Sequence, residues 1–278
     1  MRTLLALAVA GALLQGCALR EPHPAELEPE IPTLTPRAST YHDLINLPKP
    51  RGVVVAAVYG FRDQTGQYKP SPASSFSTSV TQGAASMLMD ALQASGWFMV
   101  LEREGLQNLL TERKIIRASQ QKEGTPANIL DELPPLQAAN IVLEGGIVGF
   151  DSNVRTGGEG ARYLGIGGSR EYRVDQVTVS LRAVDVRTGQ VLANVMTSKT
   201  IYSVARSAGV FKFIELKDLL ELEAGYTYNE PAQLCVLSAI EAAVAHLIAQ
   251  GVERRLWQAA DHGSLWNSSL AKYLAHYR

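Results

Sequence analysis

Gly52-Val53-Val54-Val55-Ala56-Ala57-Val58-Tyr59 is a near-continuous apolar run close to the start of the chain's body. Such a run, without polar alternation, is typical of a strand that is buried on both faces. Apolar residues at helical spacing follow from about Thr78 to Ala94, and Trp97 to Leu101 is a second apolar run. Strands that alternate with helices predict an α/β domain.

The same alternation continues to about residue 150. Residues 61–76 contain Gly66, Pro70 and Pro72 and predict a loop. Residues 104–118 predict a second helix, 135–139 a short third helix, and 141–145 another strand. We therefore expect residues 51–150 to form one α/β domain.

The pattern changes after residue 150. A glycine-rich stretch, 157–168, lies between loosely alternating segments, and residues 182–194 predict a separate short hairpin with a Thr188-Gly189 turn. The most regular alternation in the chain runs from Leu220 to Tyr228, where apolar residues occupy every second position. Alternation of this kind, with a further extended segment at 197–214, predicts β-strands at 151–156, 171–181 and 220–228 that can pair as two hairpins.

Two interpretations of these hairpins remain open from periodicity alone. They are transmembrane β-strands, which need roughly nine to eleven residues each, or an antiparallel sheet with one packed and one wet face. Two hairpins per chain cannot close a barrel, and open edges would leave unpaired backbone groups in lipid. The membrane interpretation therefore requires an oligomer.

The C-terminal part, 229–278, is predicted to be helical. Pro231 opens a long apolar helix that reaches about Trp257, with Arg254-Arg255 in its last turns. Cys235 lies in this apolar context and is expected to be a buried, inert thiol, and His246 is expected to pack. The last twenty residues either pack on a neighbour or trail.

The N-terminus predicts export. Leu4 to Leu14 is an uncharged run of the length of a secretory signal, too short for a transmembrane helix. Leu14-Gln15-Gly16-Cys17 resembles the lipobox of bacterial lipoproteins, which predicts a signal peptide at 1–16 and a covalent lipid on Cys17. Ala18, in place of Asp, points to the outer membrane.

The segment that follows Cys17 is rich in Pro and Glu up to residue 50 and predicts an extended tether, with a short docked turn at 41–47. We expect no transmembrane helix in the rest of the chain, since we find no later run of eighteen apolar residues.

Composition excludes several functions. The chain carries 26 basic and 27 acidic residues, so it has no electrostatic footprint for nucleic acid. The five His have no metal-ligand spacing, there is no nucleophile elbow, and the glycines at 165–168 do not open a helix as a dinucleotide loop would. We therefore expect neither an enzyme nor a cofactor other than the lipid.

Several blocks together resemble the family of outer-membrane curli secretion channels, the CsgG family. The resemblance runs in order from the lipobox to about Trp257 and is carried by residues 65–78, 102–110, 112–117, 158–163, 194–199, 209–211, 225–227 and 229–231.

This resemblance implies an α+β fold in which a periplasmic α/β domain carries two amphipathic hairpins. The hairpins would lie at about 151–181 and 195–228, with turns near Leu164–Gly167 and Phe213–Lys217. About nine subunits would each contribute these four strands to one shared transmembrane barrel. Unfolded curli subunits would diffuse through the pore without ATP. A periplasmic factor would cap the entrance, and a surface factor would couple exit to fibre nucleation.

The resemblance also places a pore constriction in the loop 65–77. Phe76 matches the family's constriction Phe, whereas Ser71 stands where Tyr is usual and Ser75 where Asn is usual. Symmetry repeats each side chain around the ring, so we expect a pore with one aromatic layer and a wider opening. The alternative function is a periplasmic lipoprotein that binds envelope proteins without spanning the membrane.

Overall fold

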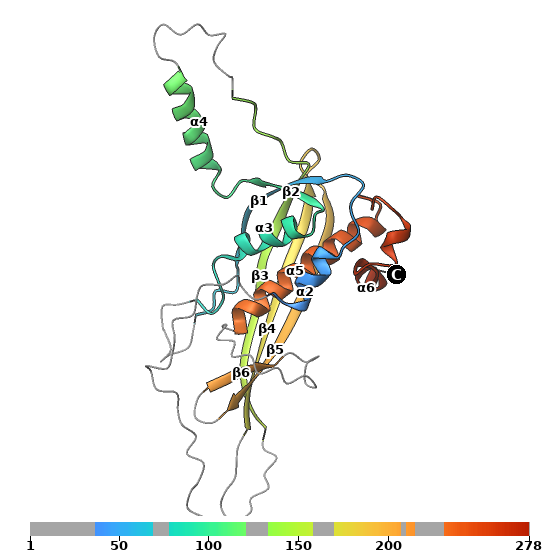
Figure 1. Ribbon diagram of the computed structural model, residues 1–278. Helices are drawn as coiled ribbons and strands as arrows, with labels where there is room; N and C mark the ends of the chain where they lie inside the picture. The colour runs from blue at the N-terminus through green and yellow to red at the C-terminus, as the bar shows by residue number, and fades with distance from the viewer. Residues whose placement is uncertain are drawn as a thin grey trace, which may run out of the picture. The chain divides into compact units, whose positions relative to one another are not determined.

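The computed structural model describes residues 37–68, 78–120, 133–157, 170–206, 210–214 and 231–277, with side chains described over most of these ranges. Six strands form one sheet in the order β2-β1-β3-β4-β5-β6 (Figure 1). The strands are β1 Val54–Asp63, β2 Phe98–Glu102, β3 Ile141–Gly157, β4 Arg170–Asp185, β5 Val191–Arg206 and β6 Val210–Ile214. The helices are α2 Ser39–Ile45, α3 Ala84–Ala94, α4 Leu106–Gln120, α5 Pro231–Glu253 and α6 Leu270–Leu274, with short 3₁₀ turns at Gly263–Leu265 and Ala275–Tyr277.

The sheet is mixed, as the order of elements in the sequence requires. β1 pairs in parallel with β2 and β3, because helices connect these strands. β3, β4, β5 and β6 pair antiparallel in chain order. The predicted α+β class is therefore confirmed for the single chain.

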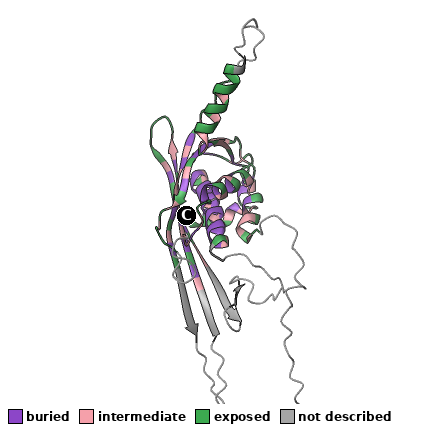
Figure 2. Ribbon diagram, turned by 90° about the vertical axis from the view of Figure 1, so that its left-hand side faces the viewer, coloured by how far each residue is buried: buried purple, intermediate pink, exposed green. Residues whose placement is uncertain are grey.

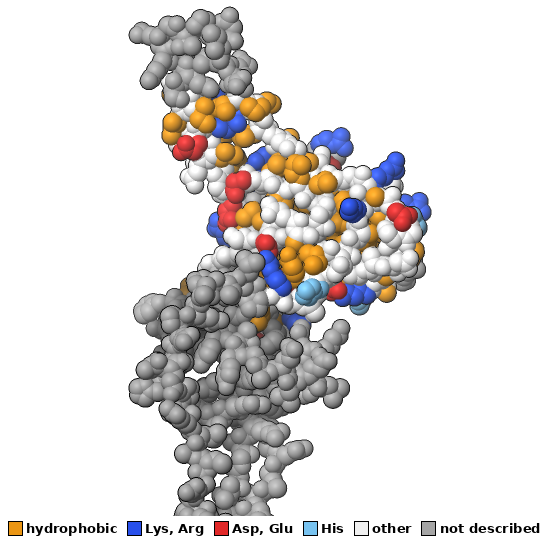
Figure 3. Space-filling view, in the orientation of Figure 1, with side chains coloured by type: hydrophobic (Ala, Val, Ile, Leu, Met, Phe, Trp, Pro, Cys, Tyr) orange, Lys and Arg blue, Asp and Glu red, His pale blue; other side chains and the backbone are white. Residues whose placement is uncertain are grey.

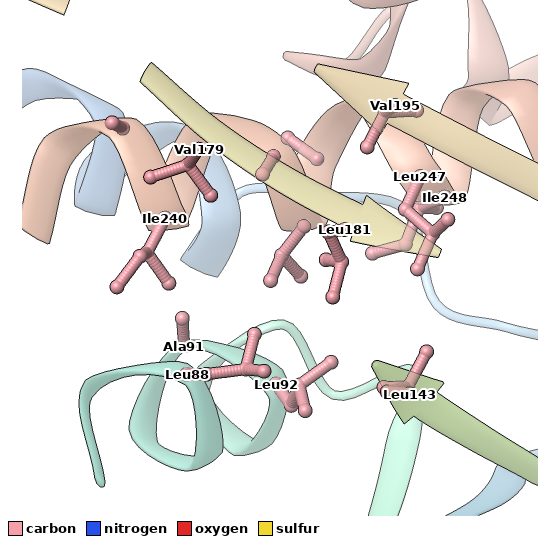
Figure 4. Close-up of a cluster of buried hydrophobic side chains, with 14 of the residues drawn as sticks. Leu88, Ala91, Leu92, Leu143, Val179, Leu181, Val195, Ile240, Leu247 and Ile248 are labelled. Carbon is pink, nitrogen blue, oxygen red and sulfur yellow. The ribbon is translucent and has the colours of Figure 1, made fainter. Parts of the chain in front are cut away.

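One hydrophobic core lies between the sheet and the helices α3 and α5. Figure 4 shows Leu88 and Leu92 of α3 facing Leu143 of β3, with side chains from β4, β5 and α5 around them. Ala56 and Val58 of β1 are fully buried in the same core, as the opening apolar run predicts, whereas Val53 and Tyr59 near the ends of that run are exposed. Figure 2 shows the buried residues concentrated where helices meet strands.

The segment between β1 and α3 differs from its prediction at both ends. β1 continues to Asp63, so Phe61 is a buried strand residue and not the start of a loop. α3 begins at Ala84 and not at Thr78, because Thr78 pairs with Tyr68 in an isolated β-bridge.

The predicted helix at 135–139 is wrong. Residues 133–139 have no regular structure, and Pro135 restricts only Pro134 to extended backbone, without requiring a helix after it. The carbonyl oxygens of Pro134 and Gln137 instead accept hydrogen bonds from Arg113 at 2.5 Å and Arg103 at 2.7 Å. The helix predicted over 104–118 is found as α4, and it exposes Leu110, Ile115 and Ile116 (Figure 3).

From the sequence we expect no transmembrane helix after the signal segment, but α5 is long and apolar enough to cross a membrane by length and composition. Residues Gln233–Glu253 have a mean hydropathy of 1.6. Most of this helix is buried, however, and it packs on β4 and β5. α5 is therefore the core helix of the body.

The end of α5 also differs from its prediction. Arg254 and Arg255 follow the helix, and Arg255 has a φ of 60°. Leu256 N bonds Gly251 O at 2.8 Å and Arg255 N bonds Val252 O at 3.0 Å, which is the pattern of a Schellman cap. The last twenty residues pack on the chain itself, since Leu265, Leu270, Tyr273 and Leu274 are buried.

Residues 37–50 are docked on the body, so the described end of the predicted tether is not extended chain. The short turn predicted at 41–47 is found as α2, with Leu44 fully buried. Trp97 Nε1 donates to the carbonyl oxygen of Pro48 at 2.8 Å, and Pro50 pairs with Ala259.

Candidate functional site

Strands β3, β4 and β5 are long and form one continuous antiparallel meander. They contain 17, 16 and 16 residues. β3 and β4 pair from Ile141↔Asp185 to Gly157↔Arg170, and β4 and β5 pair from Val184↔Val191 to Tyr172↔Val204. The strand predicted at 141–145 and the first arm of the hairpin at 151–181 are therefore a single element.

The strands extend past the helices that cover them (Figure 1). Core residues of β4 run from Val177 to Ala183, whereas the strand begins at Arg170. The end of the meander near the β4–β5 turn thus packs in the core of the α/β body, and the opposite end continues beyond the helices.

The turn between β4 and β5 has the predicted chemistry. Asp185 Oδ1 accepts hydrogen bonds from the backbone N–H groups of Arg187 at 2.9 Å and Thr188 at 2.8 Å, and Gly189 has a φ of 71°. These bonds lower the pKa of Asp185. The turn joins the long strands, so the hairpin at 182–194 is the near end of the meander and not a separate unit.

The second hairpin reverses earlier than expected. β6 pairs with β5 from Arg206↔Val210 to Tyr202↔Ile214. The chain therefore turns back between Arg206 and Val210, and Phe213 and Ile214 lie in a strand rather than in the predicted turn at 213–217. Residues 215–230, including the alternating segment Leu220 to Tyr228, lie outside the described residues, as does the first expected turn at 164–167.

The structure describes the base of the predicted constriction loop. The backbone N–H of Ser79 donates to the carbonyl oxygen of Gln67 at 2.9 Å, and Tyr68 pairs with Thr78. The loop therefore leaves and returns through one pinned pair of strand-like segments. Ser71, Ser75 and Phe76 are outside the described residues, and Cys17 is too.

Asp63 organises the loop base. Its Oδ1 accepts from Thr65 N at 2.8 Å and Thr65 Oγ1 at 2.7 Å, and its Oδ2 accepts from Gln82 Nε2 at 3.5 Å. One carboxylate thus ties the outgoing chain to the returning chain. The Asp-x-Thr spacing at 63–65 is a signal for such a turn that our sequence analysis missed.

The loop base lies at a fixed level of the meander. Asp63 pairs with Ile147, and Gln64 N donates to Ile147 O at 2.9 Å. β3 is irregular here, because its register with β4 shifts between Ile147 and Gly149. Gly145 is also closely approached by β4, since a Cβ there would stand 2.0 Å from the carbonyl oxygen of Ser180. The loop that follows Asp63 therefore starts beside Ile147, at the point where β3 continues toward the first hairpin.

A shallow pocket of about 300 Å³ opens beside the loop base and is lined by Tyr59, Gln64, Glu144 and Arg182, among others. Arg182 Nη2 and Glu144 Oε2 form an ion pair at 2.8 Å, and both side chains are about half exposed. Within the described part of the chain no cluster of three or more metal-binding side chains occurs.

Cys235 is buried in α5, as predicted. Its Sγ lies 3.0 Å from the carbonyl oxygen of Lys199, and burial raises the pKa of the thiol to about 12. Such a thiol is not a reactive nucleophile at neutral pH.

Glu241 of α5 was not singled out by our sequence analysis. It is the one charged side chain between Pro231 and Val252 and is fully buried. Burial raises its pKa to about 7, against the hydrogen bond from Thr40. The signal in the sequence that points to Glu241 is a single acidic residue within an otherwise uncharged apolar helix.

Comparison with known proteins identifies the class of this architecture. Residues 37–275 match the family described as "Curli production assembly/transport component CsgG". The curated protein of that name from Escherichia coli (strain K12) is 51% identical over 267 residues, which cover 96% of this chain and 95% of the relative. The protein of the same name from Salmonella typhimurium (strain LT2) is 51% identical over 265 residues, covering 95% and 94%.

The chain is therefore a component of bacterial curli assembly and transport, a transport protein rather than an enzyme. It belongs to the CsgG family. Among solved structures, a PelC dodecamer from Paraburkholderia phytofirmans is 15% identical and covers 74% of this chain and 91% of its own, with a TM-score of 0.27.

Proposed function

We propose that this chain is an outer-membrane lipoprotein that assembles into a ring and exports unfolded curli subunits by diffusion. The long meander carries this proposal. Strands of 16 to 17 residues exceed the roughly nine to eleven that a membrane-spanning strand needs, so they can serve both the body and the membrane.

Oligomerisation follows from backbone chemistry. In lipid every backbone polar group must find a partner, and a single chain's meander has two edges. A ring of subunits, about nine as the family resemblance implies, closes these edges into one barrel. Unfolded curli subunits are then the cargo, and a periplasmic cap and a surface nucleation factor are the partners.

The loop 65–77 is the proposed pore constriction, with Ser71, Ser75 and Phe76 facing the path. The pinned base at Gln67, Tyr68, Thr78 and Ser79 supports this role, because a constriction must hold its side chains at a fixed level. Phe76 would form an apolar collar around an extended chain. Ser71 removes the bulk that Tyr supplies in relatives, so this pore would be wider.

The proposed lipid on Cys17 would hold each subunit at the inner leaflet until its hairpins find neighbours. Acyl chains anchor through roughly 0.8 kcal/mol per buried methylene. We expect Cys17→Ser to abolish labelling by radioactive palmitate and to give a periplasmic form that secretes poorly. Cys235→Ser is the matched control and keeps the label. Normal outer-membrane pores from Cys17→Ser would contradict the role of the anchor.

The central experiment is negative-stain imaging of the chain purified from outer membranes, combined with conductance in planar bilayers. Rings that conduct support the channel. A non-conducting monomer that leaves the membrane when Cys17 is removed would instead support a periplasmic protein-binding lipoprotein.

A further inference from the structure

The segment that contains α2 is held on the body by polar contacts at three points. Arg37 Nη1 lies 2.5 Å from Asp90 Oδ2 of α3. The hydroxyl of Thr40 donates to Glu241 Oε2 of α5. Asp43 accepts hydrogen bonds at its carboxylate from Lys272 and from the hydroxyl of Tyr273, the latter at 2.9 Å, and its carbonyl accepts from Ser269 at 2.6 Å.

The middle contact differs from the other two in its burial. Arg37, Asp90 and Lys272 retain between 31% and 53% of their side-chain exposure, whereas Glu241 is 0% exposed. Glu241 Oε2 is bonded to Thr40, but Oε1 has no hydrogen-bond partner among the described residues. An ionised carboxylate at this position would be charged, shielded from water and hydrogen-bonded at only one of its two oxygens.

The charges around Glu241 do not compensate for its burial. Arg37 attracts it, but the guanidinium is already paired with Asp90 and stacked on the Tyr41 ring at 4.4 Å. Asp90 and Asp43 repel a negative charge at position 241. Other titratable groups on the elements packed around α5 include His42 of α2, Lys272 and Tyr273 of α6, Asp175 of β4, Lys199 of β5, and His246 with His276 and Tyr277.

We propose that Glu241 is a pH-sensitive latch, which holds α2 on the body when its carboxyl group is protonated and weakens that hold when it ionises. α2 covers the carboxyl group, so undocking of α2 exposes it to water. Water then solvates the charge that the docked interface cannot.

The direction follows from linkage. Burial raises the pKa of Glu241 to about 7 in the docked state, against an ordinary value of 4.5. Docking is therefore strongest below about pH 4.5, weakens by roughly tenfold per pH unit as the pH rises, and levels off above about pH 7. Acid closes the latch, and neutral pH loosens it.

The latch controls the free length of the N-terminal segment. If Cys17 carries the lipid, as proposed above, docked α2 leaves residues 18–36 between anchor and body. Undocking adds residues 37–47, at up to about 3.5 Å each. A subunit would thus be held closer to its membrane in acid. The latch itself rests on the described contacts and not on the lipid.

Hydrogen exchange of the full chain at pH 5.0 and pH 7.5, corrected for intrinsic amide rates, tests the proposal. We expect the protection of amides in 39–47 to fall between tenfold and a hundredfold at the higher pH. Glu241→Gln, a neutral isostere, should remove most of this fall. Glu253→Gln, at an exposed position on the same helix, should behave like the native chain.

Three outcomes would overturn the latch. They are equal protection of 39–47 at both pH values in the native chain, an unchanged fall in Glu241→Gln, and an equal fall in the core amides of β3 and β4. Thr40→Val gives an independent check, because it should reduce protection of the segment and leave its pH dependence in place. None of these readouts requires a pore, so they fail or succeed independently of the proposed channel.

Discussion

Gly251 of α5 lies so close to the indole of Trp257 that a Cβ at position 251 would stand 1.8 Å from Trp257 Cε2. Trp257 Nε1 also donates to the carbonyl oxygen of Ile248 at 3.0 Å, and its ring meets Phe98 edge-to-face. The indole thus closes the end of the core over a glycine.

This contact predicts the effect of Gly251→Ala. The added methyl group forces the indole outward, and overpacking of this kind costs roughly 1–3 kcal/mol. We expect the urea concentration at the midpoint of unfolding to fall, as measured by tryptophan fluorescence. Gly52→Ala is the control, because a Cβ there would meet nothing within 4 Å. Equal stability of the two variants would show that the indole moves freely.

The loop base gives a second prediction. Asp63→Ala removes the acceptor that joins Thr65 to Gln82, which should cost about 1 kcal/mol in stability. The larger effect should be local, as faster hydrogen exchange of the Ser79 amide that bonds Gln67. Glu104→Ala, at an exposed carboxylate, should leave this amide unchanged. If the Ser79 amide exchanges at the same rate in Asp63→Ala, the Tyr68–Thr78 β-bridge holds the loop base without help from Asp63.

His246 predicts a loss of stability in acid. Its ring is packed edge-to-face on Tyr273 at 4.8 Å and on His276 at 5.2 Å. Burial, with His276 as the second cause, lowers its pKa to about 4. The neutral ring thus contributes fully above about pH 6.5, and this contribution is lost as the pH falls toward 4, by roughly 2 kcal/mol after allowing for partial exposure.

The titration of Glu241 runs in the opposite direction over much of this range, so the native pH profile alone is ambiguous. The difference in unfolding free energy between the native chain and His246→Gln isolates the imidazole, because Glu241 is common to both. We expect the difference to shrink between pH 7.5 and pH 4.5. A constant difference would show that the pKa of the imidazole is the same in the folded and the unfolded chain.

Position 71 tests the proposed constriction. Ser71→Tyr would introduce the aromatic side chain that the family resemblance implies at this position, and ring symmetry would repeat it in every subunit. We expect single-channel conductance in planar bilayers to fall severalfold, while Ser71→Ala leaves it nearly unchanged. The same conductance in both variants would place residue 71 away from the narrowest point.

Several elements followed from local pattern alone. The apolar run at 52–59, the helices α3 and α5 and the Asp185 turn were predicted because burial on both faces, helical spacing and turn chemistry leave direct marks in sequence. The helix at 135–139 failed because apolar residues after two prolines mimic helical spacing, and two arginines bind the carbonyl oxygens of that segment instead.

The sequence by itself determined the family of this protein, its alternating α/β body and the buried character of Cys235. Only the tertiary structure decided that β3 runs unbroken from the core into the hairpin, and that α2 covers Glu241. Both depend on contacts between residues far apart in the chain, and no local periodicity records which distant backbone or carboxyl group a segment meets. The apolar run that opens at Gly52 predicted a strand, but its partners on each side were set by packing.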